Sequence, residues 1–155
     1  MKRLLSIMYV VAITTLLVSC SKGDDPTAQD FCVNVYYTYS DYSDYGERLA
    51  SPSYVLLFKD NGNNIDESKM SITDLQLYDT NGNALDLIRT SPSTSGVNTF
   101  EGVENGKYVI LALYSPYTFV KYYSYKKISV DYDYRVTTEK IVFDCTKDSG
   151  YQTWK

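Results

Sequence analysis

Short runs of alternating apolar and polar residues, each ended by turn-forming residues, most restrict the fold of this chain. Apolar side chains alternate with polar or smaller ones from Phe31 to Tyr39, and a second run from Tyr54 to Phe58 is continuously apolar. A period of two predicts β-strands, because successive side chains of a strand point to opposite faces. After Cys20, no stretch of about ten residues combines helical periodicity with helix caps. The pattern predicts an all-β domain.

The rest of the chain repeats this alternation between turns. Further strand candidates are 72–78, 84–89, 97–100, 108–114, 122–132 and 134–145. The tract 79–83, Asp-Thr-Asn-Gly-Asn, contains residues that tolerate the positive φ of a hairpin turn, and 91–96 is expected to be a loop. Seven to eight short strands joined by turns are typical of an antiparallel β-sandwich. We expect a single domain over residues 31–155, long enough to bury one core.

The amino terminus predicts export. Two basic residues, Lys2 and Arg3, precede an apolar run from Leu4 to Val18, which is shorter than the roughly 20 residues that span a bilayer. The run ends in Leu17-Val18-Ser19-Cys20, which resembles the lipobox of bacterial lipoproteins. The resemblance implies that residues 1–19 are removed and that Cys20, with two or three acyl chains, anchors the protein stably in a membrane. The alternative is a plain signal peptide that happens to end in a cysteine.

Residues 20–30 are small, polar and acidic, so we expect a flexible tether. The tract also resembles the short acidic segment that directs some lipoproteins to the outer leaflet of the outer membrane, although Lys22 interrupts it. We therefore expect a lipid-anchored, surface-exposed protein of the bacterial outer membrane. The alternative is an ordinary solvated linker on a lipoprotein that faces the periplasm.

Charge and composition exclude several functions. Loss of Lys2 and Arg3 with the signal changes the net charge from −4 to about −6, which disfavours nucleic acid and electrostatic adhesion to anionic membranes. The chain contains no histidine, the usual general base and the commonest transition-metal ligand. No phosphate-binding or dinucleotide-binding glycine pattern occurs. We expect no enzyme activity and no cofactor.

Two oxygen-rich loops have competing interpretations. Residues 60–67 could supply ligands to Ca²⁺, but their spacing differs from that of an EF-hand and an Asn-Gly turn explains them without a metal. Asp41, Asp44 and Glu47 could form a pair of glycosidase carboxylates, but nothing in the sequence raises the pKa of one of them. A solvated loop is the simpler interpretation in both cases.

Cys32 and Cys145 bracket the expected domain. Exported proteins enter an oxidising compartment, so we expect a disulfide between them; two small buried thiols are the alternative. Their positions in the alternating pattern disagree, because Cys32 lies opposite Val33 and Val35 whereas Cys145 shares a face with Phe143.

One segment resembles a known fold family. The pattern Phe100-x-x-Val103-x-x-Gly106-x-Tyr108-x-Ile110-x-Ala112 resembles the penultimate segment of transthyretin-like, or prealbumin-like, sandwich domains. The resemblance implies a transthyretin-like β-sandwich in which Gly106 forms a tight turn, in a conformation costly for other residues, and Tyr108 begins a buried core strand.

Tyrosine is unusually abundant, and aromatic faces can anchor a protein interface or stack on sugars. The expected binding surface consists of tyrosines in or beside two loops: Tyr36, Tyr39, Tyr42, Tyr45, Tyr117 and Tyr122. The main hypothesis is a non-enzymatic binding or assembly module that contacts another envelope or extracellular protein. The alternative is a glycan-binding accessory lipoprotein that uses its surface tyrosines. Burial in the core or on a sheet face remains the simpler interpretation of any single tyrosine.

Overall fold

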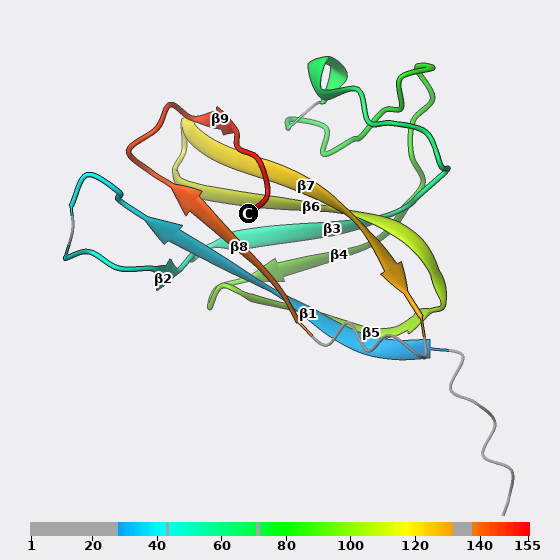
Figure 1. The fold of residues 1–155 in the computed structure, drawn as a ribbon, viewed down its shortest axis with the longest axis horizontal. Helices are drawn as coiled ribbons and strands as arrows, with labels where there is room; N and C mark the ends of the chain where they lie inside the picture. Colours follow the sequence, from blue (N-terminus) through cyan, green and yellow to red (C-terminus); the bar gives the residue numbers. More distant parts are fainter. Residues whose placement is uncertain (1–27, 43, 71, 132–137) are drawn as a thin grey trace, which may run out of the picture.

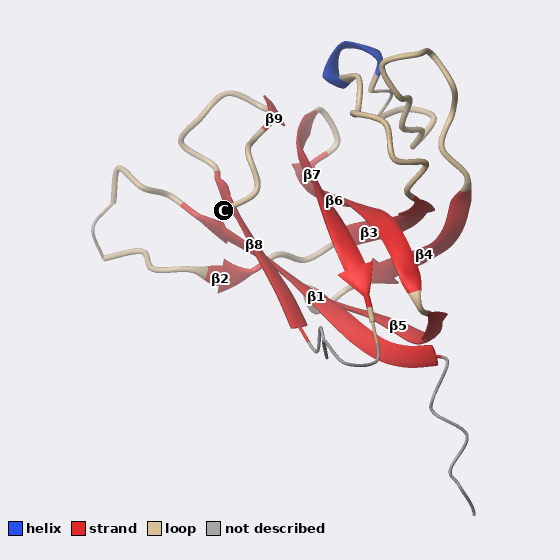
Figure 2. Ribbon diagram, turned by 45° about the vertical axis from the view of Figure 1, so that its right-hand side comes forward, coloured by secondary structure: helices blue, strands red, loops and turns tan. Residues whose placement is uncertain are grey.

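The computed structural model describes residues 28–42, 44–70, 72–131 and 138–155. They form two packed β-sheets and one short 3₁₀ helix (Figures 1 and 2). The strands are β1 (Ala28–Thr38), β2 (Arg48–Leu49), β3 (Ser53–Lys59), β4 (Leu87–Ser93), β5 (Val97–Glu104), β6 (Gly106–Tyr117), β7 (Val120–Val130), β8 (Thr138–Asp144) and β9 (Gly150–Tyr151), with the helix η1 at Glu67–Lys69. The expected all-β sandwich is confirmed. The lipobox and most of the tether lie outside the described residues, whereas β1 begins at Ala28, inside the segment expected to be tether.

Neither sheet is purely antiparallel. In the first sheet, β1 pairs antiparallel with β2 and β5 and parallel with β8. The second sheet has the order β4-β3-β6-β7-β9, and its last pair is parallel. A parallel pair needs a long connection, because the chain must return to the same end of the sheet. The expected antiparallel sandwich therefore becomes a sandwich of two mixed sheets.

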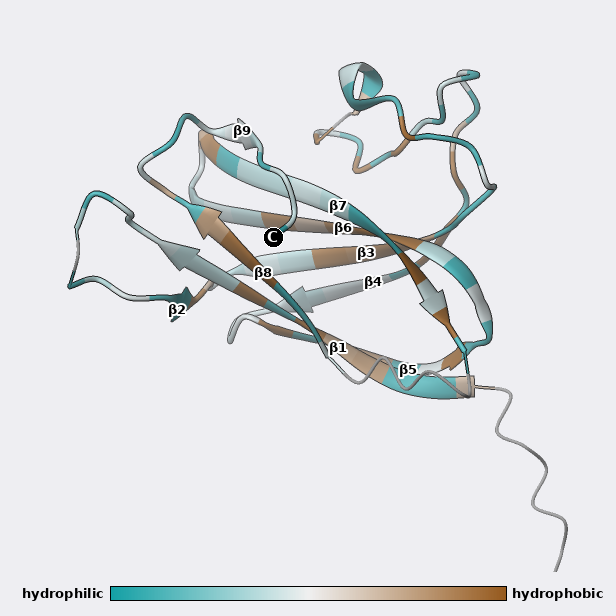
Figure 3. Ribbon diagram, viewed as in Figure 1, coloured by the Kyte–Doolittle hydropathy of each residue, from teal (hydrophilic) through white to brown (hydrophobic). Residues whose placement is uncertain are grey.

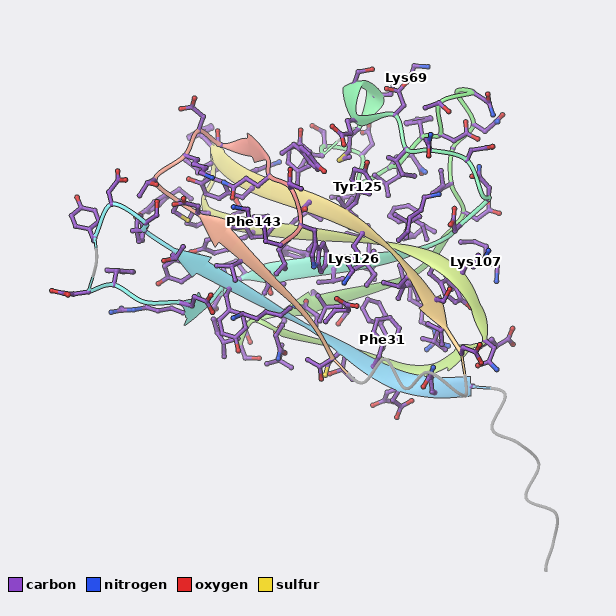
Figure 4. The ribbon with its side chains drawn as sticks, in the orientation of Figure 1. Phe31, Lys69, Lys107, Tyr125, Lys126 and Phe143 are labelled. Atoms are coloured by element: carbon purple, nitrogen blue, oxygen red, sulfur yellow. The ribbon has the colours of Figure 1, made fainter. Side chains whose placement is uncertain are left out.

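The main core lies between the two sheets. Alternate residues of β1, such as Phe31, Val33 and Val35, point inward, and they meet inward-facing residues of β3, β6 and β8. Figure 3 shows these hydrophobic positions along the middle of the strands, with hydrophilic residues in the loop after β1. Phe31 and Phe143, labelled in Figure 4, occupy this core from opposite ends of the first sheet.

The central strands of the second sheet, β3 and β6, are buried on both faces. Leu56 and Phe58 of β3 lie on the face opposite the main core, where they pack with Leu77 and Leu85 of the segment 60–86, here called the cover segment. This arrangement explains why the run from Tyr54 to Phe58 is continuously apolar. The strand expected at 72–78 does not form; the cover segment instead makes turns, η1 and isolated bridges such as Tyr78 with Ala84. The loop expected at 91–96 is partly strand, because β4 continues to Ser93.

Residues 150–155, here called the C-terminal strap, make contacts with both sheets. β9 pairs with Tyr122 and Tyr123 of β7, in the second sheet. Gln152 accepts a hydrogen bond from Asp144 N and donates one to Asp144 O, which satisfies both backbone groups at the end of β8 in the first sheet. The indole of Trp154 donates to Lys140 O in the same strand. The strap covers strand edges that would otherwise be open to pairing with another chain.

Candidate functional site

The strongest candidate site is a groove on the outer face of the second sheet, here called the aromatic groove. Its volume is about 800 Å³. One wall is the end of the β6–β7 hairpin, the other is the cover segment, and the start of β3 forms part of the floor. The lining residues are Pro52, Tyr54, Ile72, Thr73, Leu75, Leu113, Tyr114, Ser115, Pro116, Tyr117, Thr118, Phe119 and Lys121. Most of the lining is apolar, as in ligand and docking grooves of this size.

Three aromatic side chains on this groove are unusually exposed. Phe119 is 94 % exposed, Tyr117 69 % and Tyr54 41 %. A single exposed apolar residue is ordinary, but several gathered on one groove mark an interaction surface. Burial of aromatic rings by a partner would supply much of a binding free energy.

A β-bulge positions the tip of the hairpin. The antiparallel register of β6 and β7 shifts between Tyr114 and Tyr117, whose partner is Val120. The hydroxyl oxygen of Ser115 lies 2.9 Å from Tyr117 O and 3.1 Å from Val120 O, so it holds the two sides of the tip together. Bulges redirect the side chains that follow them, which explains how a hairpin tip can present two neighbouring rings to solvent.

The opposite wall contains a strained residue. Leu75 has a φ of +54°, in the left-handed region that branched side chains seldom occupy. Such a conformation costs on the order of 1 kcal/mol or more and persists only where surrounding structure imposes it. Leu75 is half-buried against the apolar cluster between the second sheet and the cover segment, here called the outer core, and it lines the groove. The strained backbone therefore places an apolar side chain at the site.

A buried carboxylate holds the cover segment in shape. Asp79 is fully buried and accepts hydrogen bonds from the side-chain amides of Asn61, Asn63 and Asn83 at 2.8–3.1 Å. The backbone N–H groups of Asn81 and Asn83 also donate to it. Burial alone would raise the pKa of the Asp79 carboxyl, but the hydrogen bonds from Asn83, Asn63 and Asn61 outweigh this effect and hold the pKa well below its usual range. Asp79 therefore joins the two asparagine-rich turns through hydrogen bonds to both of them.

The two turns have similar sequences, a signal that the strand-by-strand interpretation missed. Residues 61–66 read Asn-Gly-Asn-Asn-Ile-Asp and residues 81–86 read Asn-Gly-Asn-Ala-Leu-Asp. In both turns the glycine has a φ of +86°, and the aliphatic residue, Ile65 or Leu85, is buried in the outer core. Among the described residues, no group of three or more acidic or cysteine side chains could hold a metal ion.

The cover segment is also tied to β7. Figure 4 shows Tyr125 projecting from β7 toward the part of the cover segment that carries Lys69, and its hydroxyl donates to Glu67 Oε1 at 2.9 Å. Burial raises the pKa of Tyr125 well above its usual range, and the hydrogen bond to Glu67 raises it further. Lys127 pairs with Asp60 at 3.0 Å. These contacts hold the second wall of the groove against the sheet.

The expected tyrosine surface divides into three parts. Tyr42 is 67 % exposed in the loop after β1, and Tyr117 lines the aromatic groove. Tyr39 and Tyr45 are half-buried and contact each other edge to face, while Tyr36 lies on the outer face of the first sheet beneath the Lys140 amine. Tyr122 is buried in the main core, so its assignment to a binding surface was wrong.

Tyr122 is buried because an aromatic stack crosses the sandwich. The rings of Tyr37 and Tyr114 stack at 5.2 Å, Tyr114 lies 6.3 Å from Tyr122, and Tyr122 lies 6.2 Å from Phe143. Burial raises the pKa of Tyr122 to about 12, with a further increase from the neighbouring Cys145. Tyr114 and Tyr122 are therefore core residues, and the partly buried Tyr37 packs against the same core.

The expected disulfide between Cys32 and Cys145 is absent. Cys32 pairs in register with Thr138, at the start of β8, whereas Cys145 follows the end of that strand. About seven residues of strand separate the two positions, or roughly 20 Å, far beyond the limit of about 7 Å between bridged Cα atoms. The parallel pairing of β1 with β8 therefore places the cysteines at opposite ends of one strand pair.

A second, polar groove of about 730 Å³ lies beside β8 and the C-terminal strap. Its lining includes Lys140, Lys147 and Lys155, together with Gln152 and Thr153. Lys140 pairs with Glu47, and Lys147 lies 3.9 Å from Asp144. Most of these polar groups already have partners within the protein, so fewer of them are available to bind a ligand.

Comparison of this chain with known proteins gives a distant structural match and no family. No protein-family model matches its sequence, and no curated protein matches it. Among solved structures, it is similar to a crystal structure from Pseudomonas aeruginosa described as a "putative carbohydrate binding protein". The two share 12 % sequence identity with a TM-score of 0.40, over 80 % of this chain and 92 % of that one. Within residues 28–42, 44–70, 72–131 and 138–155, no helix is long and apolar enough to cross a membrane.

Proposed function

We propose that this chain is a lipid-anchored, non-enzymatic binding module of a bacterial cell envelope, whose aromatic groove docks another envelope or extracellular protein. The observation that carries the proposal is the convergence of Phe119, Tyr117 and Tyr54 on one apolar groove. Among the described residues, the lining contains no Asp, Asn or Arg side chain, the polar groups expected beside a sugar-stacking platform. Protein docking therefore fits this groove better than glycan binding.

Anchoring enters the proposal through the amino-terminal sequence. The Leu17-Val18-Ser19-Cys20 ending supports lipidation of Cys20, and the acidic tether supports presentation at the surface of the outer membrane. A lipid anchor would keep the module at high local concentration beside its membrane-bound neighbours, so a modest groove affinity would suffice.

The fold family also belongs to the proposal. Tyr108 is buried at the start of β6, as the transthyretin-like resemblance implies, and its hydroxyl donates to Glu104 O at 2.8 Å. This return of a tyrosine hydroxyl to the backbone just upstream resembles the tyrosine corner of immunoglobulin-type sandwiches. Gly106 differs from the expectation: its φ is not positive, and a Cβ there would lie 2.8 Å from Lys59 Nζ. We propose that the domain is transthyretin-like, because Tyr108 is buried at the start of β6 as that resemblance implies.

Site-specific photo-crosslinking in intact cells tests the docking proposal. A benzophenone amino acid at position 119 is expected to yield a discrete crosslinked product, which weakens when Tyr54 is also changed to alanine. The control places the same amino acid at Thr99, an exposed position of β5 in the other sheet. Equal crosslinking from both positions, or none from position 119, would contradict a binding role for the groove.

Glycan binding is the second candidate, and the polar groove favours it. Gln152, Thr153 and the lysines there are the kinds of group that hydrogen-bond sugar hydroxyls, and Tyr151 lies beside them. Retention of the protein on immobilised polysaccharide that is lost on Lys140→Ala, while Phe119→Ala binds normally, would support this candidate over protein docking.

A further inference from the structure

The aromatic groove lies at the end of the sandwich opposite the tether. Ala28, the first described residue, pairs with Glu104, immediately before β6 begins. The groove is built around Tyr114–Phe119, at the other end of the 12-residue β6. Figures 1 and 2 show the same separation: the chain enters β1 at one end of the molecule, and the β6–β7 turn lies at the other.

The length of the tether makes this separation significant. Eight residues, Cys20 to Thr27, precede β1, and they span at most about 28 Å when fully extended. The 12 residues of β6 span roughly 40 Å at the rise of an antiparallel strand. A lipid on Cys20 would therefore hold the start of β1 near the bilayer, with the groove at the far end of the sandwich.

The charge of the groove restricts what it can bind. Of the described residues that line the groove, Lys121 alone carries a charge. Like Lys59, Lys107 and Lys155, Lys121 makes no ion pair within the part of the chain that the structure describes, so its charge in the groove is not neutralised by a carboxylate of that part. An unneutralised ammonium beside an apolar, aromatic surface is complementary to an apolar segment that carries a carboxylate.

From these observations we infer that the aromatic groove faces away from the membrane and receives an apolar peptide segment of a partner protein, with an acidic side chain of that segment paired to Lys121. This inference rests on the proposed function and specifies the chemistry of its partner. Phe119 and Tyr117 supply the apolar contact, and Lys121 selects for negative charge.

A charge-swap experiment tests the selection. The probes are two fluorescent peptides that alternate leucine and phenylalanine with either glutamate or lysine, and the readout is anisotropy with the purified full-length protein in nanodiscs. The wild-type protein is expected to prefer the glutamate peptide at least tenfold, and Lys121→Glu to reverse the preference. Phe119→Ala should weaken both peptides, while Lys107→Glu, a lysine far from the groove, should leave the preference unchanged.

The orientation is tested separately with brominated lipids. The added tryptophan of Phe119→Trp should show no more quenching by brominated lipid in the nanodisc than the native Trp154 shows in the unaltered protein. Strong quenching would overturn the inference in favour of insertion into the bilayer. Failure of the glutamate peptide to bind, or equal binding of the two peptides, would also overturn it. If crosslinking from position 119 still succeeded in cells, only this inference would fail and the docking function would stand.

Discussion

At the scale of single residues, buried polar groups do most to hold the site's supports in place. Asp79 collects five hydrogen bonds from the two turns of the cover segment, and Asn98 links the sheets by donating to Ser53 Oγ in β3 and Val33 O in β1. A buried polar group is costly when unpaired and specific when paired. The main effect of these residues is therefore to determine which segments lie together. Their contribution to the total free energy of unfolding is smaller.

Tyr108 gives a stability prediction at this scale. Tyr108→Phe removes only the hydrogen bond to Glu104 O and should lower the free energy of unfolding by about 1 kcal/mol. Tyr108→Ala also empties part of the core and should cost about 3–5 kcal/mol. Urea denaturation measures both changes. The exposed Tyr117→Ala serves as control and should stay within about 0.5 kcal/mol of wild type; an unchanged Tyr108→Ala would contradict the core assignment.

At the scale of secondary-structure elements, the C-terminal strap is short but joins both sheets. Its strand pairing involves two residues of β7, and its remaining contacts to the first sheet are side chains that bond to the backbone of β8. Along β8, the side chains of Gln152 and Trp154 thus make the backbone hydrogen bonds that a paired strand would otherwise make.

Gln152 is the residue by which the strap can be tested. Gln152→Ala should lower the free energy of unfolding by about 1–3 kcal/mol, because it leaves the N–H and C=O of Asp144 without their amide partner. Hydrogen exchange should show the amide of Asp144 losing protection before the amides of β3. Thr153→Ala, in the same strap but exposed, is the control and should change stability by less than about 0.5 kcal/mol. Equal effects of the two variants would argue against this role.

At the scale of the whole molecule, the proposed lipid anchor and tether come before the β-sandwich in the chain. The groove is placed far from the entry of the chain, and no histidine changes charge near neutral pH. Because no histidine is present to titrate, binding in the proposed groove should change little with modest acidification.

Lipidation is the first prediction at this scale. Cys20→Ser should abolish labelling by a fatty-acid analogue and release the protein from the membrane fraction, because the proposed acyl chains would provide its hold on the bilayer. Cys32→Ser should leave both labelling and membrane association intact. Label retained by the Cys20→Ser protein would exclude this anchoring site.

The second prediction concerns pH. Burial alone would raise the pKa of Asp144, but hydrogen bonds from Thr146 and Ser40 lower it to about 2, so its stabilisation is present above pH about 4 and lost as the pH falls toward 2. Burial raises the pKa of Cys145 to about 11 and of Tyr122 to about 12, so stability should decline as the pH rises above about 9. Between about pH 5 and 8 it should stay nearly constant.

Urea denaturation across this pH range provides the measurement. Asp144→Asn should reduce the acid dependence, because the variant has no carboxyl to protonate at that position. A steep change in wild-type stability between about pH 5 and 8 would contradict the assignment.

Local sequence determined which segments are strands. The alternation in β1 and the apolar runs of β3 and β6 predict them correctly, because side-chain direction in a strand depends only on neighbouring residues. Tyr117, at the end of β6, was already a binding candidate from the sequence, and it lines the aromatic groove. The expected strand at 72–78 failed because its apolar residues cover the second sheet instead of pairing within it.

Pairing between distant segments was decided only by the tertiary structure. Nothing in the alternation of β1 indicates that β8, more than a hundred residues later, lies parallel beside it, and this pairing separates Cys32 from Cys145. Likewise, Tyr54, Leu75 and Phe119 come from three separate segments and form one groove because the cover segment folds back over the sheet. Strand formation follows from local periodicity, whereas partners, direction and surface shape depend on which apolar faces bury one another across the whole chain.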